Sequence, residues 1–77
     1  MNKANKEKLL TPRINKIMDL ENGDFEVVDI NNGKRQFRIN NILDLYPLSQ
    51  KYFNLKTQTW GTYDNLDKII FKTFPNR

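Results

Sequence analysis

Between residues 24 and 39, apolar and polar positions alternate in the manner of a β-hairpin. The first half is rich in residues that favour strands, and Asn32-Gly33 behind it is a typical two-residue hairpin turn. A hairpin closed at that turn sets Val28 opposite Phe37. Because side chains alternate between the two faces of a strand, one face should be apolar and the other polar. The apolar face would hold Val28, Ile30, Phe37 and Ile39, and the polar face Asp29, Gln36 and Arg38.

A second hairpin is indicated farther along the chain. Two strand-like segments, residues 43–46 and 51–57, are joined by Pro47-Leu48-Ser49-Gln50, which has the composition of a turn. We expect Gly61 to break the strand that follows, because glycine weakens the interior of a strand.

The aromatic residues of this hairpin should divide between its faces. Alternation directs Phe53 to one face and Tyr52 to the other. We expect Phe53 and Trp60 in the core, since a small domain often places its large aromatic residues there. The alternative is one small surface that gathers Tyr46, Tyr52, Phe53, Trp60 and Tyr63. With a simple hairpin loop, Tyr46 and Tyr52 would lie across from each other on the face opposite Phe53.

The last part of the chain predicts a helix that ends near Phe74. Asp64 is a suitable N-cap, Asp67 is an acid in the first turn, and Pro75 stops the helix. Four apolar residues at helical spacing form a stripe that should pack on the sheet: Leu66, Ile69, Ile70 and Phe74.

The N-terminal third is less defined. Residues 1–10 are mostly polar and basic, and we expect a loose arm there. Residues 11–21 fit two structures. Thr11-Pro12 is a good helix start, and Asn22-Gly23 could end that helix. Asn22-Gly23 is also a strong hairpin signal, which would make the same stretch an extra strand.

These elements predict one α+β domain over residues 11–77. We expect a small antiparallel sheet of three to four strands, with the C-terminal helix packed on one face and an N-terminal helix or extra strand. The expected core consists of Ile14, Ile17, Val28, Ile30, Phe37, Ile39, Leu43, Leu45, Phe53, Leu55, Trp60, Leu66, Ile69, Ile70 and Phe74.

The residues that enzymes use most often are missing. The chain has no cysteine and no histidine, which removes thiolate ligands, the usual general base near neutral pH and the commonest metal ligand. Ser49 is the only serine and lacks the usual activating base. We therefore expect a protein that binds rather than catalyses, with no catalytic residue, cofactor or metal site.

Length and hydropathy limit where the protein can function and how stable it can be. No apolar run approaches the roughly 18 residues of a membrane span, and no apolar signal core follows the basic N-terminus, so we expect a cytoplasmic setting. A chain of 77 residues buries only a little over half of its unfolded surface. A homodimer that covers apolar surface would add stability, and the sequence leaves the oligomeric state open.

The net charge of +4 hides an acidic block at residues 19–29, which carries five acids and no base. If Asp24 and Glu26 share a strand, they lie about 7 Å apart on one face, close to the spacing of successive phosphates. Such a block could mimic nucleic acid toward a protein with a basic groove, or simply be solvated surface. The candidate partner-binding residues are Asp24, Glu26, Asp29, Tyr46 and Tyr52.

Basic residues offer a second binding mode. The stretch around the first turn places three cations on a protruding hairpin, which could lie along a phosphate backbone. Two further lysines alternate with aromatic residues that could stack on exposed bases. The candidate nucleic-acid-binding residues are Lys34, Arg35, Arg38, Lys51 and Lys56.

About half of the chain resembles a pattern found in short phage and prophage proteins. The matching segments are Asp44-Leu45-Tyr46-Pro47, then Lys51-Tyr52-Phe53-Asn54-Leu55-Lys56-Thr57, then Trp60-Gly61 and a closing helix. The resemblance departs at Leu48-Ser49-Gln50, where a glycine-containing loop is usual, and it assigns no active residues.

This resemblance implies a mobile-element origin. We expect a small binding protein that acts on a protein or nucleoprotein complex, such as an anti-CRISPR-like inhibitor of host defence. The alternative is a regulator that binds nucleic acid directly through its basic hairpin.

Overall fold

The computed structural model describes residues 3–30 and 35–75 and has an α+β fold with a five-stranded antiparallel sheet. The strands follow one another in chain order, so each is paired with its sequence neighbour. The α+β class, the antiparallel sheet and the C-terminal helix are as predicted, whereas the expected count of three to four strands was too low. The elements are α1 (Lys3–Met18), the 3-10 helix η1 (Asp19–Gly23), β1 (Val27–Asp29), β2 (Phe37–Ile39), β3 (Leu43–Tyr46), β4 (Lys51–Asn54), β5 (Thr59–Thr62) and α2 (Leu66–Thr73).

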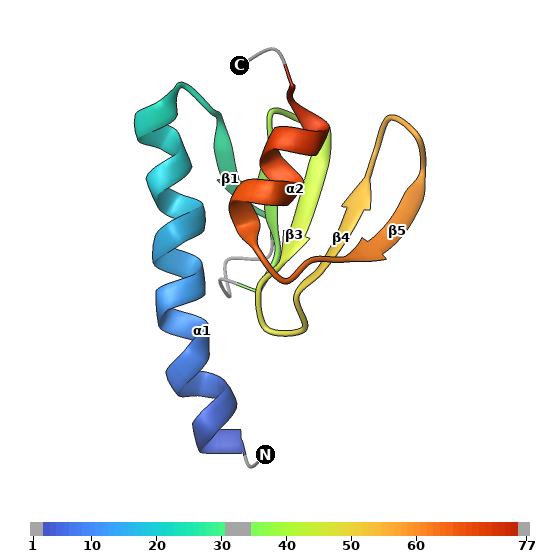
Figure 1. Cartoon of the computed structure of the whole chain (residues 1–77). Coiled ribbons are helices and arrows are strands. Elements are labelled where there is room, and N and C mark those ends of the chain that lie inside the picture. Colours follow the sequence, from blue (N-terminus) through green and yellow to red (C-terminus); the bar gives the residue numbers. More distant parts are fainter. Residues whose placement is uncertain (1–2, 31–34, 76–77) are drawn as a thin grey trace.

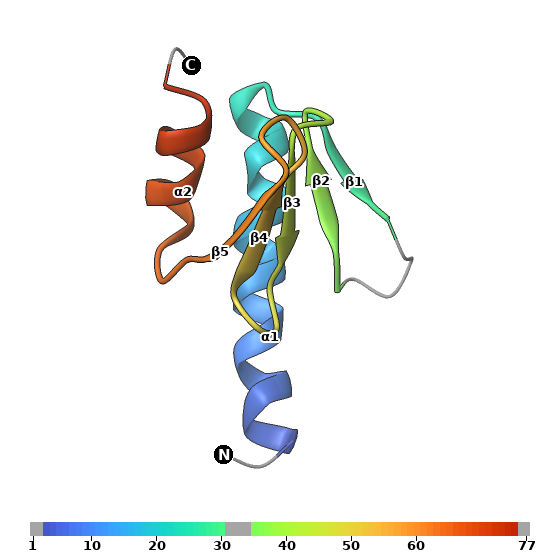
Figure 2. The ribbon, with the colours of Figure 1, turned by 90° about the vertical axis from the view of Figure 1, so that its right-hand side faces the viewer.

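The hydrophobic core lies between one face of the sheet and the two helices. Helix α2 covers the middle of that face, and α1 runs alongside the β1 end of the sheet (Figure 1). Figure 2 shows α2 standing off one side of the sheet, with no described helix on the opposite side. We call the covered side the inner face and the opposite side the outer face. The buried cluster consists of Ile17, Phe37, Ile39, Leu43, Leu45, Ile69, Ile70 and Phe74.

Helix α1 begins earlier than predicted. It starts at Lys3 rather than at Thr11, so the residues from Lys3 to Leu10 that we expected as a loose arm are helical, and Pro12 lies inside the helix. Proline removes one backbone hydrogen bond from a helix interior and is a strong local stop signal. The preceding residues are mostly lysine, glutamate, alanine and leucine, which favour helix.

The two alternatives for residues 11–21 are resolved in favour of helix. The chain continues from α1 into η1, which ends at Gly23. Asp24, not the glycine, takes the left-handed conformation at φ 69°, and its N–H donates to the carbonyl of Leu20. Aspartate tolerates this conformation better than most residues do, so Asn22-Gly23 ends a helix here and does not turn a hairpin.

The register of β1 against β2 differs from the prediction by one residue. Val28 lies opposite Arg38 and Val27 lies opposite Ile39. A shift of one residue moves every side chain of a strand to the other face. Val28 is therefore on the outer face and 41% exposed, and it does not belong to the core. The predicted turn residues Asn32-Gly33 lie outside the described residues.

Asn40 fixes this register at the other end of the pair. Its side-chain oxygen accepts the N–H of Glu26 at 2.7 Å, and its own N–H donates to the carbonyl of Glu26 at 2.9 Å. Asn40 and Asn41 both have positive φ, at 51° and 58°, and the N–H of Ile42 donates to the carbonyl of Ile39 at 3.0 Å. These two asparagines make the tight turn from β2 to β3.

Strand β5 was missed because Gly61 lies inside it. Gly61 pairs with Tyr52 of β4, and a Cβ built on Gly61 would fall 2.5 Å from both Cε2 and Oη of Tyr52. The tyrosine ring thus occupies the space that a side chain at position 61 would need. In the turn before β5, the side chain of Asn54 accepts the N–H groups of Lys56 and Thr57.

Helix α2 ends near Phe74 and carries the predicted apolar stripe. Ile69, Ile70 and Phe74 are buried, and Leu66 packs against them. The N-cap is Asn65 rather than Asp64, because the Asn65 side chain accepts the N–H groups at positions 67 and 68. Among the residues described, no helix is long and apolar enough to cross a membrane.

Candidate functional site

The outer face of the sheet carries a continuous row of side chains that crosses all five strands. Val28 lies opposite Arg38, Arg38 opposite Asp44, Asp44 opposite Phe53, and Phe53 opposite Trp60. A second row beside it contains Tyr46, Lys51 and Thr62. No described helix covers this surface (Figure 2), so its exposed side chains are available to a partner.

Three of these residues form an aromatic cluster, defined as Tyr46, Phe53 and Trp60. The ring centroids of Phe53 and Trp60 are 4.7 Å apart, and those of Tyr46 and Trp60 are 5.5 Å apart. Both distances fall in the range of favourable ring contacts. Trp60 is nevertheless 62% exposed. The cluster therefore holds the indole in place and leaves much of its surface accessible.

The prediction that Phe53 and Trp60 belong to the core was wrong. Leu43, Leu45 and Tyr52 fill the inner face of the central strands, and Phe53 alternates with Tyr52 along β4. Phe53 must therefore point outward together with its neighbour Trp60. The prediction for the tyrosines also fails, because Tyr46 pairs with Lys51 and Tyr52 pairs with Leu45, on opposite faces.

A buried carboxylate supports the outer face next to the cluster. Asp44 is only 3% exposed although its side chain points away from the core. Its carboxylate accepts hydrogen bonds from Nε and Nη2 of Arg38 at 2.8 and 3.1 Å and from Nε2 of Gln36 at 3.1 Å. The hydrogen bond from Arg38 to Asp44 and the Asp44 charge raise the pKa of Arg38. Asp44 thus orients a permanent cation on the surface.

Tyr46 presents a neutral phenol to this surface. Burial is the main reason that its pKa lies above the usual value; the charge of Asp44 raises the pKa further and that of Arg38 lowers it. The phenol therefore stays protonated at neutral pH and can donate a hydrogen bond.

Lys51 borders the cluster on the exposed side. It lies between Tyr46 and Thr62 across the sheet. Together with Trp60, Gly61 and Thr62 it lines an open depression of about 400 Å³. The aromatic cluster and the depression thus share Trp60, and a cation stands beside both.

The structure brings some of the predicted nucleic-acid-binding residues together. Arg38 and Lys51 share the outer face with the aromatic cluster. Arg35 is exposed just before β2, and Lys56 is exposed in the turn between β4 and β5. Lys34 lies outside the described residues.

The predicted partner-binding residues do not share a surface. Asp24 is in a turn and Glu26 precedes β1, so the two are not neighbours on one face of a strand, and that premise was wrong. Asp29 is on the inner face, opposite Phe37. Tyr52 also packs toward the core, whereas Tyr46 is on the outer face. The argument that Asp24 and Glu26 repeat the spacing of successive phosphates therefore no longer holds.

Sequence reasoning missed Asp44 as a support of the outer face and favoured the core for Phe53 and Trp60. One signal was available for Asp44, a charged residue between two leucines in a central strand. Gly61 was a signal for strand β5, because a glycine opposite an aromatic residue in a hairpin lets the ring lie across the strand. Accepting β5 would have placed Trp60 beside Phe53.

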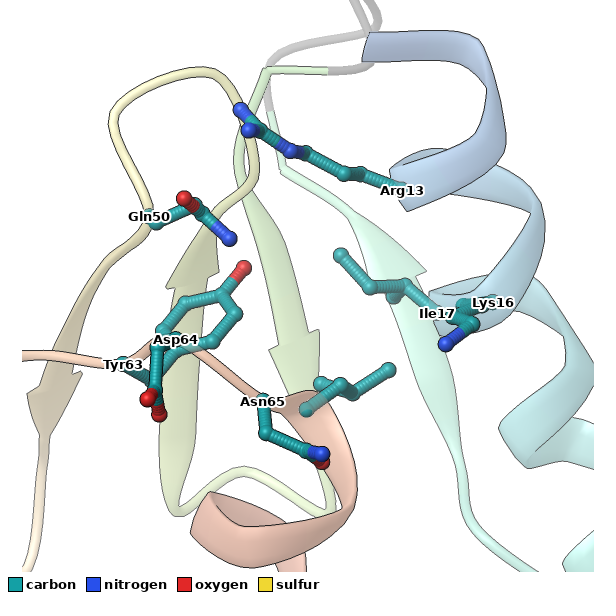
Figure 3. Close-up of a pocket in the computed structure, with 8 residues that line it drawn as sticks. Arg13, Lys16, Ile17, Gln50, Tyr63, Asp64 and Asn65 are labelled. Atoms are coloured by element: carbon teal, nitrogen blue, oxygen red, sulfur yellow. The ribbon is translucent and has the colours of Figure 1, made fainter. Parts of the chain in front are cut away.

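A second concavity lies between α1 and the start of α2 (Figure 3). This pocket has a volume of about 130 Å³. Nη1 of Arg13 donates to the carbonyls of Pro47 and Leu48, both at 3.2 Å, which fastens α1 to the turn between β3 and β4. Burial raises the pKa of Tyr63 to about 12. The residues that line the pocket are Arg13, Lys16, Ile17, Gln50, Tyr63, Asp64, Asn65 and Leu66.

The hydrogen bonds at this pocket stabilise the fold. Nη1 of Arg13 donates to two backbone carbonyls, and Asp64 lines the same pocket as Lys16. Within the described ranges, no group of three or more acidic side chains is placed to hold a metal ion. The outer face is therefore the stronger candidate site.

Comparisons with protein-family models, curated proteins and solved structures found no match for this chain. The resemblance to short phage proteins accordingly stays a prediction.

Proposed function

We propose that this domain binds single-stranded nucleic acid on the outer face of its sheet. The observation that carries the proposal is Trp60, which is 62% exposed and in contact with two further rings beside Lys51. Aromatic side chains grouped on one open face are typical of a binding surface, and a partner that covers the indole removes apolar surface from water. A base is a flat partner that an indole can stack on.

The shape of the surface favours an unpaired strand over a duplex. Bases are accessible for stacking only when they are unpaired, and aromatic side chains on an open sheet are a common platform for them. Stacking contributes roughly 1–3 kcal/mol per base and depends little on base identity. Trp60 would hold the first base, with Phe53 and Tyr46 holding the indole in position.

The charges fit a phosphate backbone. Lys51 is beside the indole, and Arg38 is in the same row. The bonds from Arg38 to Asp44 use Nε and Nη2, so Nη1 can donate to a phosphate while the ion pair stays intact. Arg35 is exposed near the start of β2. The net charge of +4 favours encounter with a polyanion.

The broader hypothesis, a phage factor that inhibits host defence, stays a prediction. The phosphate-mimic argument behind it required Asp24 and Glu26 on one strand, and neither residue lies in β1. A nucleic-acid site on the outer face is compatible with a mobile-element factor, but it does not depend on that origin.

The first experiment uses Trp60 as its own reporter, since it is the only tryptophan. Titration with a dT 4-mer at about 50 mM salt, a low-salt condition that favours phosphate contacts, should quench its fluorescence. In parallel, anisotropy of a labelled oligonucleotide should show Trp60→Ala binding roughly 5- to 150-fold more weakly, the equivalent of one stacked base.

The matched control is Phe71→Ala. Phe71 is 69% exposed, but it lies on α2, away from the outer face. We expect its affinity to match the wild type. Equal losses in the Trp60 and Phe71 variants would contradict the assignment of the site. No binding by the wild type would remove the proposal and favour a protein partner for the same face.

The charged contacts are tested separately. Lys51→Ala with Arg35→Ala should lower the slope of log affinity against log salt by about 1.4, which corresponds to two phosphate contacts on a single strand. Arg38 is left in place because its removal would strand the buried carboxylate of Asp44. An unchanged slope would show that these two cations do not contact phosphates.

A further inference from the structure

The β4–β5 hairpin is the end of the sheet, and its outward strand carries no charge. The four residues of β5 are Thr59, Trp60, Gly61 and Thr62. Within the described chain no strand pairs with the outward edge of β5. A polyanion can pass over this edge without meeting a carboxylate on the strand.

The inner side of the same hairpin is hollowed where it faces α2. Two depressions of about 140 and 200 Å³ lie there, and Tyr52, Ile69 and Lys72 line both of them. We call the two together the inner groove. Helix α2 covers the middle of the sheet, and the β4–β5 hairpin extends beyond it (Figure 1).

The groove has the chemistry of a phosphate path. Lys68 and Lys72 are exposed and one helical turn apart on α2. Polar residues of the hairpin line the side of the groove opposite these lysines, and Asp64 is the acid that lines the groove. The hairpin residues are Asn54, Thr57, Thr59 and Thr62. Lysines supply charge and hydroxyls supply hydrogen bonds to phosphate oxygens.

Thr62 connects the two sides of the hairpin. It lines the depression beside Trp60 on the outer face and also the inner groove beside Lys68. The two concave surfaces therefore meet at the β5 edge.

We infer that a single strand bound at Trp60 continues over the β5 edge at Thr62 and lays its next phosphates along Lys68 and Lys72. This inference rests on the proposed function and extends it by naming the path and the length of the site. A short oligonucleotide fills the outer face alone, whereas a longer one wraps the hairpin. For comparison, one OB-fold domain covers about 4–16 nucleotides, a range that would include both the short and the longer strand.

The experiment compares a dT 4-mer with a dT 12-mer, using Trp60 quenching at several salt concentrations. The test variant is Lys68→Ala with Lys72→Ala. The control is Lys16→Glu, which lowers the net charge by the same two units at an exposed position on α1. Circular dichroism and a thermal melt check that both variants are folded.

We expect the affinity of the 4-mer for the test variant to lie within about twofold of its affinity for the control. Both variants lose the same net charge, and salt screens the effect of charges that do not contact the oligonucleotide. The 12-mer should bind the test variant about tenfold more weakly than the control, with a salt slope lower by about 1.4. Equal 12-mer affinities in the two variants would overturn the path.

The outcomes separate the two proposals. If the 4-mer quenches Trp60 and the wild type binds the 12-mer no more tightly than the 4-mer, the outer-face site stands and the wrapped path is wrong. If neither oligonucleotide quenches Trp60, both proposals fall.

Discussion

Replacing Gly61 by alanine should destabilise the protein, although the change adds only a methyl group. Gly61 has no positive φ, so alanine is free of backbone strain there. The obstacle is the ring of Tyr52, because the new Cβ would lie 2.5 Å from its Cε2 and Oη atoms. Carbon atoms in contact normally stay about 3.5–4.0 Å apart, so the ring must move by more than about 1 Å.

The loss of stability depends on where the displaced Tyr52 ring can move. Tyr52 is half-buried and packs against the core, so a displaced ring loses those contacts. Overpacking of this kind costs about 1–3 kcal/mol. A domain of 77 residues has a total stability of about 4–12 kcal/mol. A loss of about 2 kcal/mol should lower the melting midpoint by roughly 8–16 °C.

A double-mutant cycle distinguishes the ring clash from other causes. In a Tyr52→Ala background the space above position 61 is empty, so Gly61→Ala should be neutral or stabilise by about 0.4–1 kcal/mol, since alanine restricts the unfolded chain. The coupling energy between the two positions should thus exceed about 1 kcal/mol. Urea denaturation followed by circular dichroism measures all four proteins. Additive effects, or a neutral Gly61→Ala in the native background, would refute the packing argument.

Three further predictions concern the helices and one phenol. Ile70→Ala should cost about 2–4 kcal/mol because it empties a buried position under α2, and an unchanged thermal midpoint would show that this helix is peripheral. Asn65→Ala should cost about 1 kcal/mol and speed hydrogen exchange at Asp67 and Lys68, whose N–H groups it caps; unaltered exchange at both amides would argue against the cap. Burial raises the pKa of Tyr63 to about 12, above its unfolded value near 10, so its share of stability is present below pH 10 and lost between pH 10 and 12. Tyr63→Phe should flatten that alkaline decline in urea titrations, and an equally steep decline in the variant would assign it to other groups.

Much of the local structure could be predicted from the sequence because its signals are local. The stripe of α2 has helical spacing and a proline behind it. The β3–β4 hairpin closes at the predicted turn, with Tyr46 opposite Lys51. Each of these elements depends on residues that are close in the chain, where periodicity and turn chemistry are informative.

The candidate site could be predicted only in part. Lys51, Arg38 and Tyr46 were named from their types, and the structure places all three on the outer face. Phe53 and Trp60 were assigned to the core because large aromatic residues are usually buried. Composition favours that assignment, but it cannot show which side of a sheet the helices cover.

The sequence by itself determined the α+β class, the C-terminal helix and the absence of histidine and cysteine chemistry. The tertiary structure decided the register of β1, the existence of β5 and the choice of inner face. The physical reason is that a strand repeats every two residues, so its pattern gives two alternating faces and leaves open which of them is buried. That choice depends on distant contacts: Asn40 holds Glu26 in register, Tyr52 lies over Gly61, and the two helices cover one side. Trp60 is exposed as a consequence of these contacts.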